Sequence, residues 1–328
     1  MPDPVLSVRK LRVEFPTRRG TLVAVDDVSF DIAAGEVLGV VGESGAGKSM
    51  TGAAVIGLLE PPGRIAGGEV RLAGQRIDNI GPEEMRKVRG RRVAMVFQDP
   101  LTSLNPLYRI GEQIIETIRT HATVSEAVAR DKALRLLTDV GIQGAAERID
   151  AYPHQFSGGM RQRVVLALAL AAEPELIIAD EPTTALDVSI QAQIIELFKR
   201  LCRERGAAVM LITHDMGVIA ETADRVAVMY AGRIAEIGPV ADVIRRPVHP
   251  YTVGLMGSIP DIASDAMRLT QIPGTMPRLT AIPQGCAFHP RCAHAFARCN
   301  VERPELAPRD RAAAACWLAP TTVTAEAR

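Results

Sequence analysis

Short apolar runs recur along the middle of the chain, and most of the stretches between them have helical spacing. The runs cover residues 37–41, 93–97, 176–179, 207–213 and 226–230, and residues 188–205 form one of the helical stretches. Continuous apolar runs of this length are typical of strands buried on both faces of a sheet. Their alternation with helices predicts an α/β domain with a largely parallel sheet.

Two regions depart from this alternation. Residues 6–32 alternate apolar and polar positions up to the turn Ala34-Gly35-Glu36, and residues 68–73 repeat the pattern. Period-two alternation predicts antiparallel strands with one solvated face. Residues 110–140 contain no run of the buried-strand kind and have helical spacing. We therefore expect an antiparallel β subdomain near the start and a helical subdomain over about residues 100–172.

The regular pattern ends beyond Pro247, where proline, glycine and cysteine residues become frequent. This change of composition predicts a boundary near Arg246. It separates a large α/β domain over residues 1–246 from a small irregular domain over residues 247–328.

Charge and hydropathy narrow the possible partners. Lys and Arg number 38 and Asp and Glu also number 38, so there is no global basic field of the kind that attracts nucleic acid. We expect no nucleic-acid partner. Residues 1–10 lack the apolar core of a secretory signal, and the strongly apolar stretch at residues 164–172 is too short to span a bilayer. The expected location is cytoplasmic, with peripheral membrane contact.

A glycine-rich segment lies between the first apolar run and a helical stretch. It reads Gly42-Glu43-Ser44-Gly45-Ala46-Gly47-Lys48-Ser49 and fits the phosphate-loop pattern in its required strand–loop–helix context. Glycines let backbone N–H groups surround phosphate oxygens, and the helix N-terminus adds positive potential. Lys48 is expected to reach the β- and γ-phosphates and Ser49 to ligate Mg²⁺. A glycine-rich turn with a solvated lysine is the alternative. The predicted ATP-binding segment is Gly42, Glu43, Ser44, Gly45, Ala46, Gly47, Lys48, Ser49 and Met50.

Two carboxylates end the apolar run at residues 176–179. They are Asp180 and Glu181, and they fall at the carboxyl edge of the sheet, where ligands of open α/β folds gather. Asp180 is expected to hold Mg²⁺ through water, and Glu181 to orient or polarise the attacking water. An apolar strand ending in Asp-Glu also occurs for purely structural reasons, but the phosphate loop favours the catalytic interpretation.

A small polar turn, Ser157-Gly158-Gly159, opens a long apolar helix. Alone it indicates only a helix N-cap. With the preceding motifs, the chain resembles the ATP-binding cassette (ABC) family, whose signature motif is this turn, over about residues 6–239. The resemblance implies a RecA-like parallel sheet core with antiparallel β and helical subdomains. It also implies a dimer, because in that family the turn contacts the γ-phosphate bound by the partner subunit's phosphate loop.

Further residues match family positions. Gln98 is similar to the glutamine that senses Mg²⁺ and the γ-phosphate and links to the transmembrane partner, and His214 to the switch histidine at the γ-phosphate. Asp187 matches the loop that couples the two ATP sites, although capping the helix that starts at Val188 would explain it equally well. Phe15 aligns with the aromatic that stacks on adenine, with an ordinary core role as the alternative. Gln98 and His214 have structural alternatives too, as an exposed loop amide and a lone structural histidine.

The resemblance thus implies three sets of functional residues. The catalytic residues are Lys48, Gln98, Glu181 and His214. The Mg²⁺ set is Ser49, Gln98 and Asp180. The residues facing the partner's ATP are Ser157, Gly158, Gly159 and Asp187.

Two longer segments resemble one branch of the family, the dipeptide/oligopeptide permeases, which include nickel importers. They are residues 98–106, Gln-Asp-Pro-Leu-Thr-Ser-Leu-Asn-Pro, and residues 249–252, His-Pro-Tyr-Thr. The resemblance implies an ATPase subunit at the cytoplasmic face of the inner membrane that energises uptake of di- or oligopeptides. Its partners would be a second, related ATPase subunit, two transmembrane permease subunits and, indirectly, an extracytoplasmic substrate-binding protein.

Three other functions compete with this interpretation. A nickel or other small-solute importer would carry the same motifs. A soluble cassette ATPase acting on DNA or ribosomes typically has a coiled-coil insertion or two cassettes, and neither is visible here. A nucleotide-dependent regulatory scaffold would be favoured by loss of Glu181 or of the signature turn, and both are present.

Four of the five cysteines gather in the tail: Cys286, Cys292, Cys299 and Cys316. In a reducing cytoplasm such a cluster suggests a metal site before disulfides. The spacing is not the paired Cys-x-x-Cys of a zinc ribbon, and four thiolates suit either a [4Fe–4S] cluster or tetrahedral Zn²⁺. The resemblance favours the iron–sulfur cluster, while zinc and simply buried or oxidised cysteines remain open alternatives.

Overall fold

The computed structural model describes residues 3–183, 188–258 and 271–318. Contacts divide the chain into two compact units, each built from several separate stretches. The first unit comprises residues 1–7, 31–37 and 71–211, and the second comprises residues 8–30, 38–70 and 212–328. The boundary near residue 246 and the domains on either side of it stay predictions.

The first unit contains three neighbouring strands in the order β8-β7-β6. Their bounds are β6 Val93–Val96, β7 Leu176–Asp180 and β8 Ala208–Ile212. β6 and β7 are parallel, with Val93 opposite Leu176 and Val96 opposite Ala179. Their apolar side chains are almost all buried, as the continuous runs in the sequence predict for strands covered on both faces.

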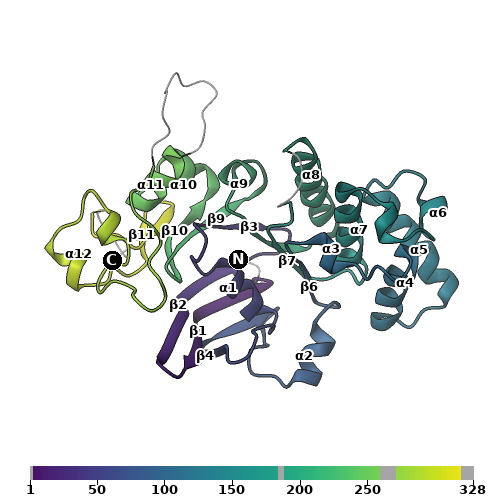
Figure 1. Ribbon diagram of the computed structural model, residues 1–328, viewed down its shortest axis with the longest axis horizontal. Helices are drawn as coiled ribbons and strands as arrows, with labels where there is room; N and C mark the ends of the chain where they lie inside the picture. Colours follow the sequence, from purple (N-terminus) through teal and green to yellow (C-terminus); the bar gives the residue numbers. More distant parts are fainter. Residues whose placement is uncertain (1–2, 184–187, 259–270, 319–328) are drawn as a thin grey trace, which may run out of the picture. The chain divides into compact units, whose positions relative to one another are not determined.

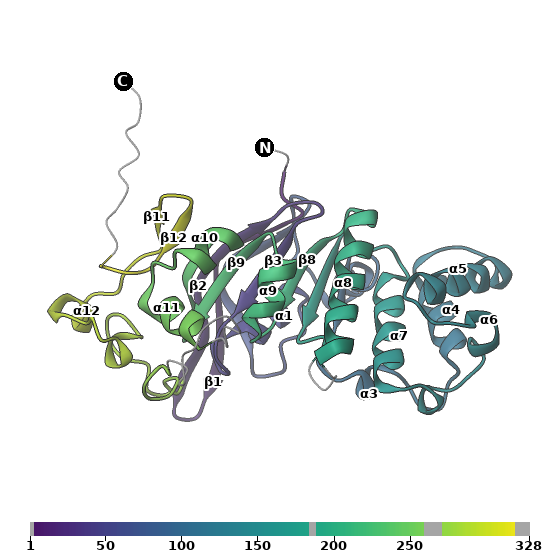
Figure 2. The same ribbon diagram turned by 90° about the horizontal axis from the view of Figure 1, so that it is seen from above.

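Helices make up most of the rest of the first unit. They are α2 Pro82–Val88, α3 Pro100–Ser103, α4 Ile110–His121, α5 Glu126–Asp139, α6 Ala145–Arg148, η1 Pro153–Gln155, α7 Gly158–Leu170 and α8 Val188–Arg205, and β5 Gln75–Arg76 is a short strand. Residues 100–172, all described, contain helices and no strand. Helices α4, α5 and α7 pack against one another through buried aliphatic residues such as Ile114 and Leu136, and Figures 1 and 2 both show them side by side.

The second unit contains most of the long strands β1 Leu6–Thr17, β2 Gly20–Ile32 and β4 Arg64–Leu72, in the order β2-β1-β4, while the start of β1 and the ends of β2 and β4 belong to the first unit. It also contains β3 Val37–Val41, which is parallel to β9 Arg225–Tyr230, and β10 Arg233–Pro239, which is antiparallel to β9. Its helices are α1 Lys48–Val55, α9 Met216–Thr222, α10 Val240–Arg245, α11 Pro250–Gly257, η2 His289–Arg291 and α12 Ala297–Val301. The mixed α/β fold with parallel and antiparallel sheets is confirmed.

Part of the tail joins a sheet, which the irregular composition beyond Pro247 did not predict. Strands β11 Ala307–Arg309 and β12 Ala312–Ala314 form a hairpin, and β12 pairs with β10, with Ala314 opposite Glu236. β10 was missed as well, because charged residues interrupt its apolar run. Three consecutive alanines in β12 carry too little hydrophobic contrast to show an alternation.

A buried carboxylate and a buried histidine hold the start of α11 against β10. Glu236 is fully buried and accepts hydrogen bonds from the backbone N–H groups of Val248 and His249, both at 2.9 Å. His249 is 3% exposed, and its Nδ1 accepts from the Tyr251 N–H at 3.0 Å, so it caps the helix. Burial lowers the pKa of His249 to about 4 and raises the pKa of Glu236.

The lowered pKa of His249 predicts that the free energy of unfolding depends on pH. As pH falls, the unfolded chain, with a histidine pKa near 6.5, takes up the proton first, while the folded chain resists it down to about pH 4. The free energy of unfolding therefore keeps its full value with respect to this group above about pH 6.5. It falls, by roughly 3 kcal/mol in total, as pH falls toward 4. The variant His249→Asn, which keeps an acceptor at the helix cap, should lose stability less steeply than the parent over this range.

Urea unfolding of parent and variant at several pH values between about 4 and 7 would measure this difference. Equal pH slopes for the two proteins would show that His249 is not held in its neutral form.

Candidate functional site: a phosphate loop and a carboxylate pair

The phosphate loop runs from β3 into α1, and surrounding backbone fixes its path. Gly42 has φ 151°, and a Cβ there would lie 2.3 Å from the carbonyl oxygen of Met229. Gly47 has φ 102°, and a Cβ there would lie 2.9 Å from the carbonyl oxygen of Ala24. Only glycine suits both positions. The strand–loop–helix context that the sequence predicted is confirmed.

Lys48 lies over this loop. Its Nζ donates to the carbonyl oxygens of Gly42 at 2.7 Å and Glu43 at 3.1 Å, and the residue is 7% exposed. Ser44, Gly45 and Ser49 are exposed. The structure therefore combines a held ammonium group, an open loop tip and a helix N-terminus, which together suit an anion with several oxygen atoms.

His214 directly follows Thr213, a residue of the second unit. The N–H of Thr213 donates to the carbonyl oxygen of Val40 at 3.1 Å, so His214 and the phosphate loop leave adjacent backbone segments. The His214 side chain is exposed. Asp215 caps α9 by accepting from the N–H groups of Gly217 and Val218. The N-cap of α9 is therefore Asp215 and not His214.

Glu181 and Gln98 are brought together in the first unit. Gln98 Nε2 donates to Glu181 Oε2 at 3.2 Å, although 83 residues separate them. Each follows a strand of the parallel pair β6 and β7, whose carboxyl ends share one edge. Glu181 also has φ 47°, an unusual backbone conformation for a residue with a side chain. Such strain clusters at functional sites. Asp180, half-buried, precedes it at the end of β7.

Ser157 caps α7 by accepting from the Met160 N–H at 3.4 Å. Gly159 is buried, and a Cβ there would lie 2.9 Å from Ile190 Cγ2, whereas Ser157 and Gly158 are exposed. The cap and a solvent-open turn therefore coexist. Asp187 lies outside the described residues.

Phe15, on β1, is half-buried. A Cβ on Gly63 would lie 2.6 Å from the ring atom Cε1 of Phe15, so the turn at residues 60–63 covers one edge of the ring. This contact fits an ordinary packing role, and adenine stacking stays a prediction.

Two tail residues contact the phosphate loop, and the sequence patterns did not predict either contact. Arg291 forms a two-pronged ion pair with the carboxylate of Glu43, and the Tyr251 hydroxyl accepts from the Glu43 N–H. Tyr251 stood in a recognised motif, but only as a mark of the branch. Nothing local identifies Arg291, because 248 residues separate it from Glu43.

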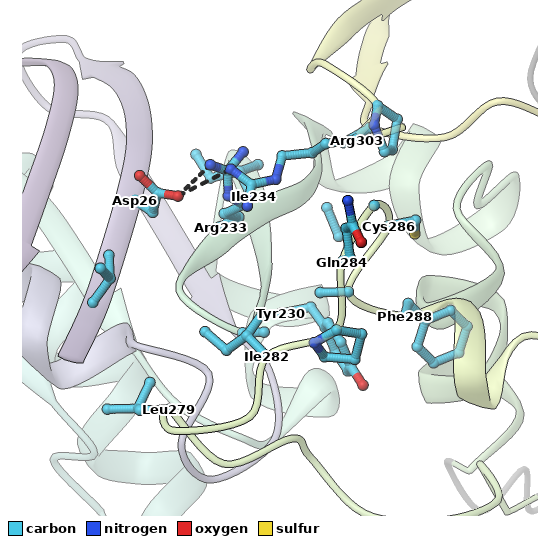
Figure 3. A pocket seen from close by; sticks show the side chains of 18 of the residues that line it. Asp26, Tyr230, Arg233, Ile234, Leu279, Ile282, Gln284, Cys286, Phe288 and Arg303 are labelled. Atoms are coloured by element: carbon cyan, nitrogen blue, oxygen red, sulfur yellow. Dashed lines mark hydrogen bonds and ion pairs between the residues drawn. The ribbon is translucent and has the colours of Figure 1, made fainter. Parts of the chain in front are cut away.

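A cavity of about 490 Å³ lies in the second unit between β2, β10 and the tail (Figure 3). Three arginines meet one carboxylate at its wall: Arg12 at 2.6 Å and Arg303 at 3.2 Å, together with Arg233, all contact Asp26. Burial raises the pKa of Asp26, but the hydrogen bond from Arg233 and the charges of the three arginines outweigh it and lower the pKa. This ion-pair network links the tail to β2.

All four tail cysteines line a second, small cavity, together with His249, His289 and His294. None of these four cysteines forms a disulfide, and the Cys286 N–H donates to the Cys299 carbonyl at 2.9 Å. Burial raises the pKa of Cys286 to about 11, and the charges of the other three cysteines act in the same direction. Within the described ranges no group of three or more His, Cys, Asp or Glu side chains has an arrangement that could hold a metal ion. The metal site therefore stays a prediction.

Comparisons with known proteins agree with this geometry. A family model for the ABC transporter matches residues 25–184, and one for the C-terminal region of oligopeptide/dipeptide transporters matches residues 235–299. The dipeptide transport ATP-binding protein DppD of Bacillus subtilis is 48% identical over 318 residues, covering 96% of this chain and 95% of that protein. The oligopeptide transport ATP-binding protein OppD of Salmonella typhimurium is 49% identical over 300 residues, covering 92% and 89%.

Solved structures show the same fold. The dimeric ABC transporter cassette MJ0796 superposes with a TM-score of 0.64 at 27% identity, covering 72% of this chain and 98% of that one. The cassette cbiO1 of Clostridium perfringens, part of the transporter complex cbiONQ, gives 0.64 at 26% identity, covering 74% and 92%. Another structure of MJ0796 is a dimeric post-hydrolysis state bound to ADP and Pi.

The fold, the phosphate loop and the carboxylate pair define an ATP-hydrolysing cassette. The chain belongs to the ABC transporter family. Its C-terminal region is that of the oligopeptide/dipeptide branch, as the sequence motifs predicted. Of the helices in the described part of the chain, none is long and apolar enough to cross a membrane.

Proposed function

We propose that this chain is the ATPase subunit of an importer that takes up di- or oligopeptides. One observation carries the choice of substrate: the branch-specific C-terminal region accompanies the cassette, and relatives at 48–49% identity over almost the whole chain are named for dipeptide or oligopeptide transport. Nickel or another small solute is the alternative cargo.

ATP hydrolysis is assigned to the residues that the sequence singled out. Lys48 and the N–H groups of residues 42–49 bind the phosphates, His214 contacts the γ-phosphate, and Phe15 packs on the adenine. Ser49, Asp180 and Gln98 hold Mg²⁺, which supplies charge neutralisation when bound. Glu181 orients and polarises the attacking water, a role supported by its strained backbone and its hydrogen bond to Gln98.

A second cassette completes each ATP site. Ser157, Gly158, Gly159 and Asp187 would contact the ATP held by the partner subunit. The solvent-open turn of Ser157 and Gly158 at the N-terminus of α7 supports this role, since a helix N-terminus favours a γ-phosphate. The partner is a related but different ATPase chain.

Two transmembrane permease subunits would bind the first unit near Gln98. Large apolar side chains are exposed close to it in sequence: Phe97 is 46% exposed, Leu107 81% and Tyr108 55%. Exposed apolar residues gathered in one segment are typical of a protein interface. The chain would then lie peripherally at the cytoplasmic face of the inner membrane, with an extracytoplasmic binding protein delivering the substrate.

We also propose that Cys286, Cys292, Cys299 and Cys316 hold a [4Fe–4S] cluster, with Zn²⁺ as the alternative. The support is that all four thiols line one cavity, which suits a four-thiolate ligand set after adjustment of the side chains. A metal here would stabilise a tail segment with few regular elements.

The importer, reconstituted with its permease subunits in vesicles, tests the function through Glu181→Gln. We expect ATP still to bind while the hydrolysis rate falls on the order of 100-fold or more, because the attacking water is no longer polarised. Uptake of a labelled dipeptide should fall in parallel. Glu84→Gln, at an exposed carboxylate on α2, is the matched control.

Two results would contradict this function. Uptake that persists in Glu181→Gln without hydrolysis would refute the motor role. Hydrolysis by the parent importer that never drives uptake of any dipeptide or oligopeptide, but drives uptake of nickel, would assign the alternative cargo.

The partner site is tested by Ser157→Arg, with Ser125→Arg as a matched control. Both serines are exposed N-caps, and each accepts a backbone hydrogen bond at 3.4 Å. Each variant therefore loses an equivalent capping hydrogen bond on its own helix. Only Ser157→Arg should lower the ATPase rate of the assembled pair, by at least about tenfold, since it fills the position of the partner's γ-phosphate. Equal rates for the two variants would remove the case for a shared site.

The cysteine proposal is tested by metal and sulfide analysis of anaerobically purified protein. We expect about four irons and four sulfides per chain, together with visible absorbance. The iron content, the sulfide content and the absorbance should all be lower in Cys292→Ser. Cys202→Ser is the control, because Cys202 is buried elsewhere in the fold and its pKa is raised to about 12 by burial. One zinc per chain without sulfide would support the alternative. Protein that contains neither iron nor zinc would refute the proposal.

A further inference from the structure

Glu43, the second residue of the phosphate loop, forms an ion pair with a tail residue, Arg291. Arg291 Nη1 donates to Glu43 Oε2 at 2.9 Å, and Arg291 Nη2 donates to Oε1 at 3.0 Å. The Arg291 side chain is 7% exposed and that of Glu43 is 28% exposed, so solvent screens this ion pair only partly. Two parallel hydrogen bonds fix the orientation of the carboxylate as well as its position.

The backbone of Glu43 is held as well. Its N–H donates to the Tyr251 hydroxyl oxygen at 2.9 Å, and Tyr251 is fully buried. Burial raises the pKa of Tyr251, so the hydroxyl stays neutral. The carbonyl oxygen of Glu43 accepts from Lys48. Tail residues therefore hold both the side chain and the N–H of one loop residue, beside the lysine that meets the phosphates.

Arg291 is itself fixed by its surroundings. Its Nε donates to the Pro273 carbonyl at 2.7 Å, and its guanidinium carbon lies 5.8 Å from the ring centre of Tyr230 and 5.9 Å from that of Phe288. Tyr230 and Phe288 pack edge to face, and Figure 3 shows both among the residues that line the cavity. Cation–π contacts and a carbonyl acceptor leave the guanidinium little freedom. Because Arg291 directly precedes Cys292, its position depends on the fold of the cysteine-bearing segment.

We propose that Arg291, acting through Glu43 and assisted by Tyr251, is a positioning residue for the phosphate loop, so that ATP affinity depends on the tail. A loop set in advance loses less conformational entropy when the phosphates bind. The inference rests on the proposed ATP site at residues 42–49. An alternative role for the same ion pair is simply to attach the tail to the fold.

The test uses the reconstituted importer and measures KM for ATP and kcat separately. Arg291→Ala should raise KM about tenfold and change kcat by less than about twofold, because the loop is loosened before binding while the hydrolytic residues are untouched. Arg291→Lys should recover only part of the affinity, since one ammonium cannot make the paired contact. Arg298→Ala is the matched control: it lies in the same tail, and its contacts are with Glu302 and Trp317.

A double-mutant cycle separates positioning from attachment. Glu43→Gln should also raise KM, and adding Arg291→Ala to it should raise KM little further, because Arg291 acts through that carboxylate. Tyr251→Phe should raise KM by a smaller factor, as one acceptor is lost. If the ion pair only attached the tail, Arg291→Ala would lower the melting temperature and leave KM at its parental value.

An unchanged KM in Arg291→Ala, or KM effects of the two single variants that multiply in the double variant, would overturn the inference. Lys48→Ala distinguishes this failure from failure of the ATP site. If Lys48→Ala loses ATP binding while Arg291→Ala binds normally, the site stands and the positioning role falls. If Lys48→Ala binds ATP like the parent, the site itself is wrong.

Discussion

The path of the phosphate loop is the constraint on which the ATP site depends. Backbone carbonyls of Met229 and Ala24 approach the loop so closely that no side chain fits at Gly42 or Gly47. This close approach fixes the path of the loop, and the Lys48 Nζ donates to the carbonyl oxygens of Gly42 and Glu43. This geometry suits several phosphate oxygens, because the segment combines an ammonium group, an exposed loop tip and a helix N-terminus.

The tail joins this site through buried polar contacts. Glu236 and His249 anchor the start of α11, which in turn presents the Tyr251 hydroxyl to the loop. Arg291 reaches the same loop residue from the cysteine-bearing segment. Buried polar groups need their partners to offset desolvation, so these contacts specify where the tail lies more strongly than apolar packing would. The branch-specific tail is thus part of the surroundings of the phosphate loop.

The contact between Gln98 and Glu181 depends on a different feature, the shared edge of parallel strands. Gln98 and Glu181 follow β6 and β7, and pairing of these strands brings their side chains within hydrogen-bonding distance. The backbone strain at Glu181 persists because the strand before it is buried and paired.

The sequence by itself determined the local parts: the buried strands, the helical segment, the phosphate loop and the carboxylates after β7. Each has a short-range pattern, since a strand period or a loop motif is complete within about ten residues. The tertiary structure alone decided that β12 pairs with β10, that three arginines surround Asp26 and that Arg291 holds Glu43. Those contacts join residues far apart in the chain, and alanines or single arginines carry no pattern that names their partner. Long-range pairing is set by the packing of the whole unit, which no local window contains.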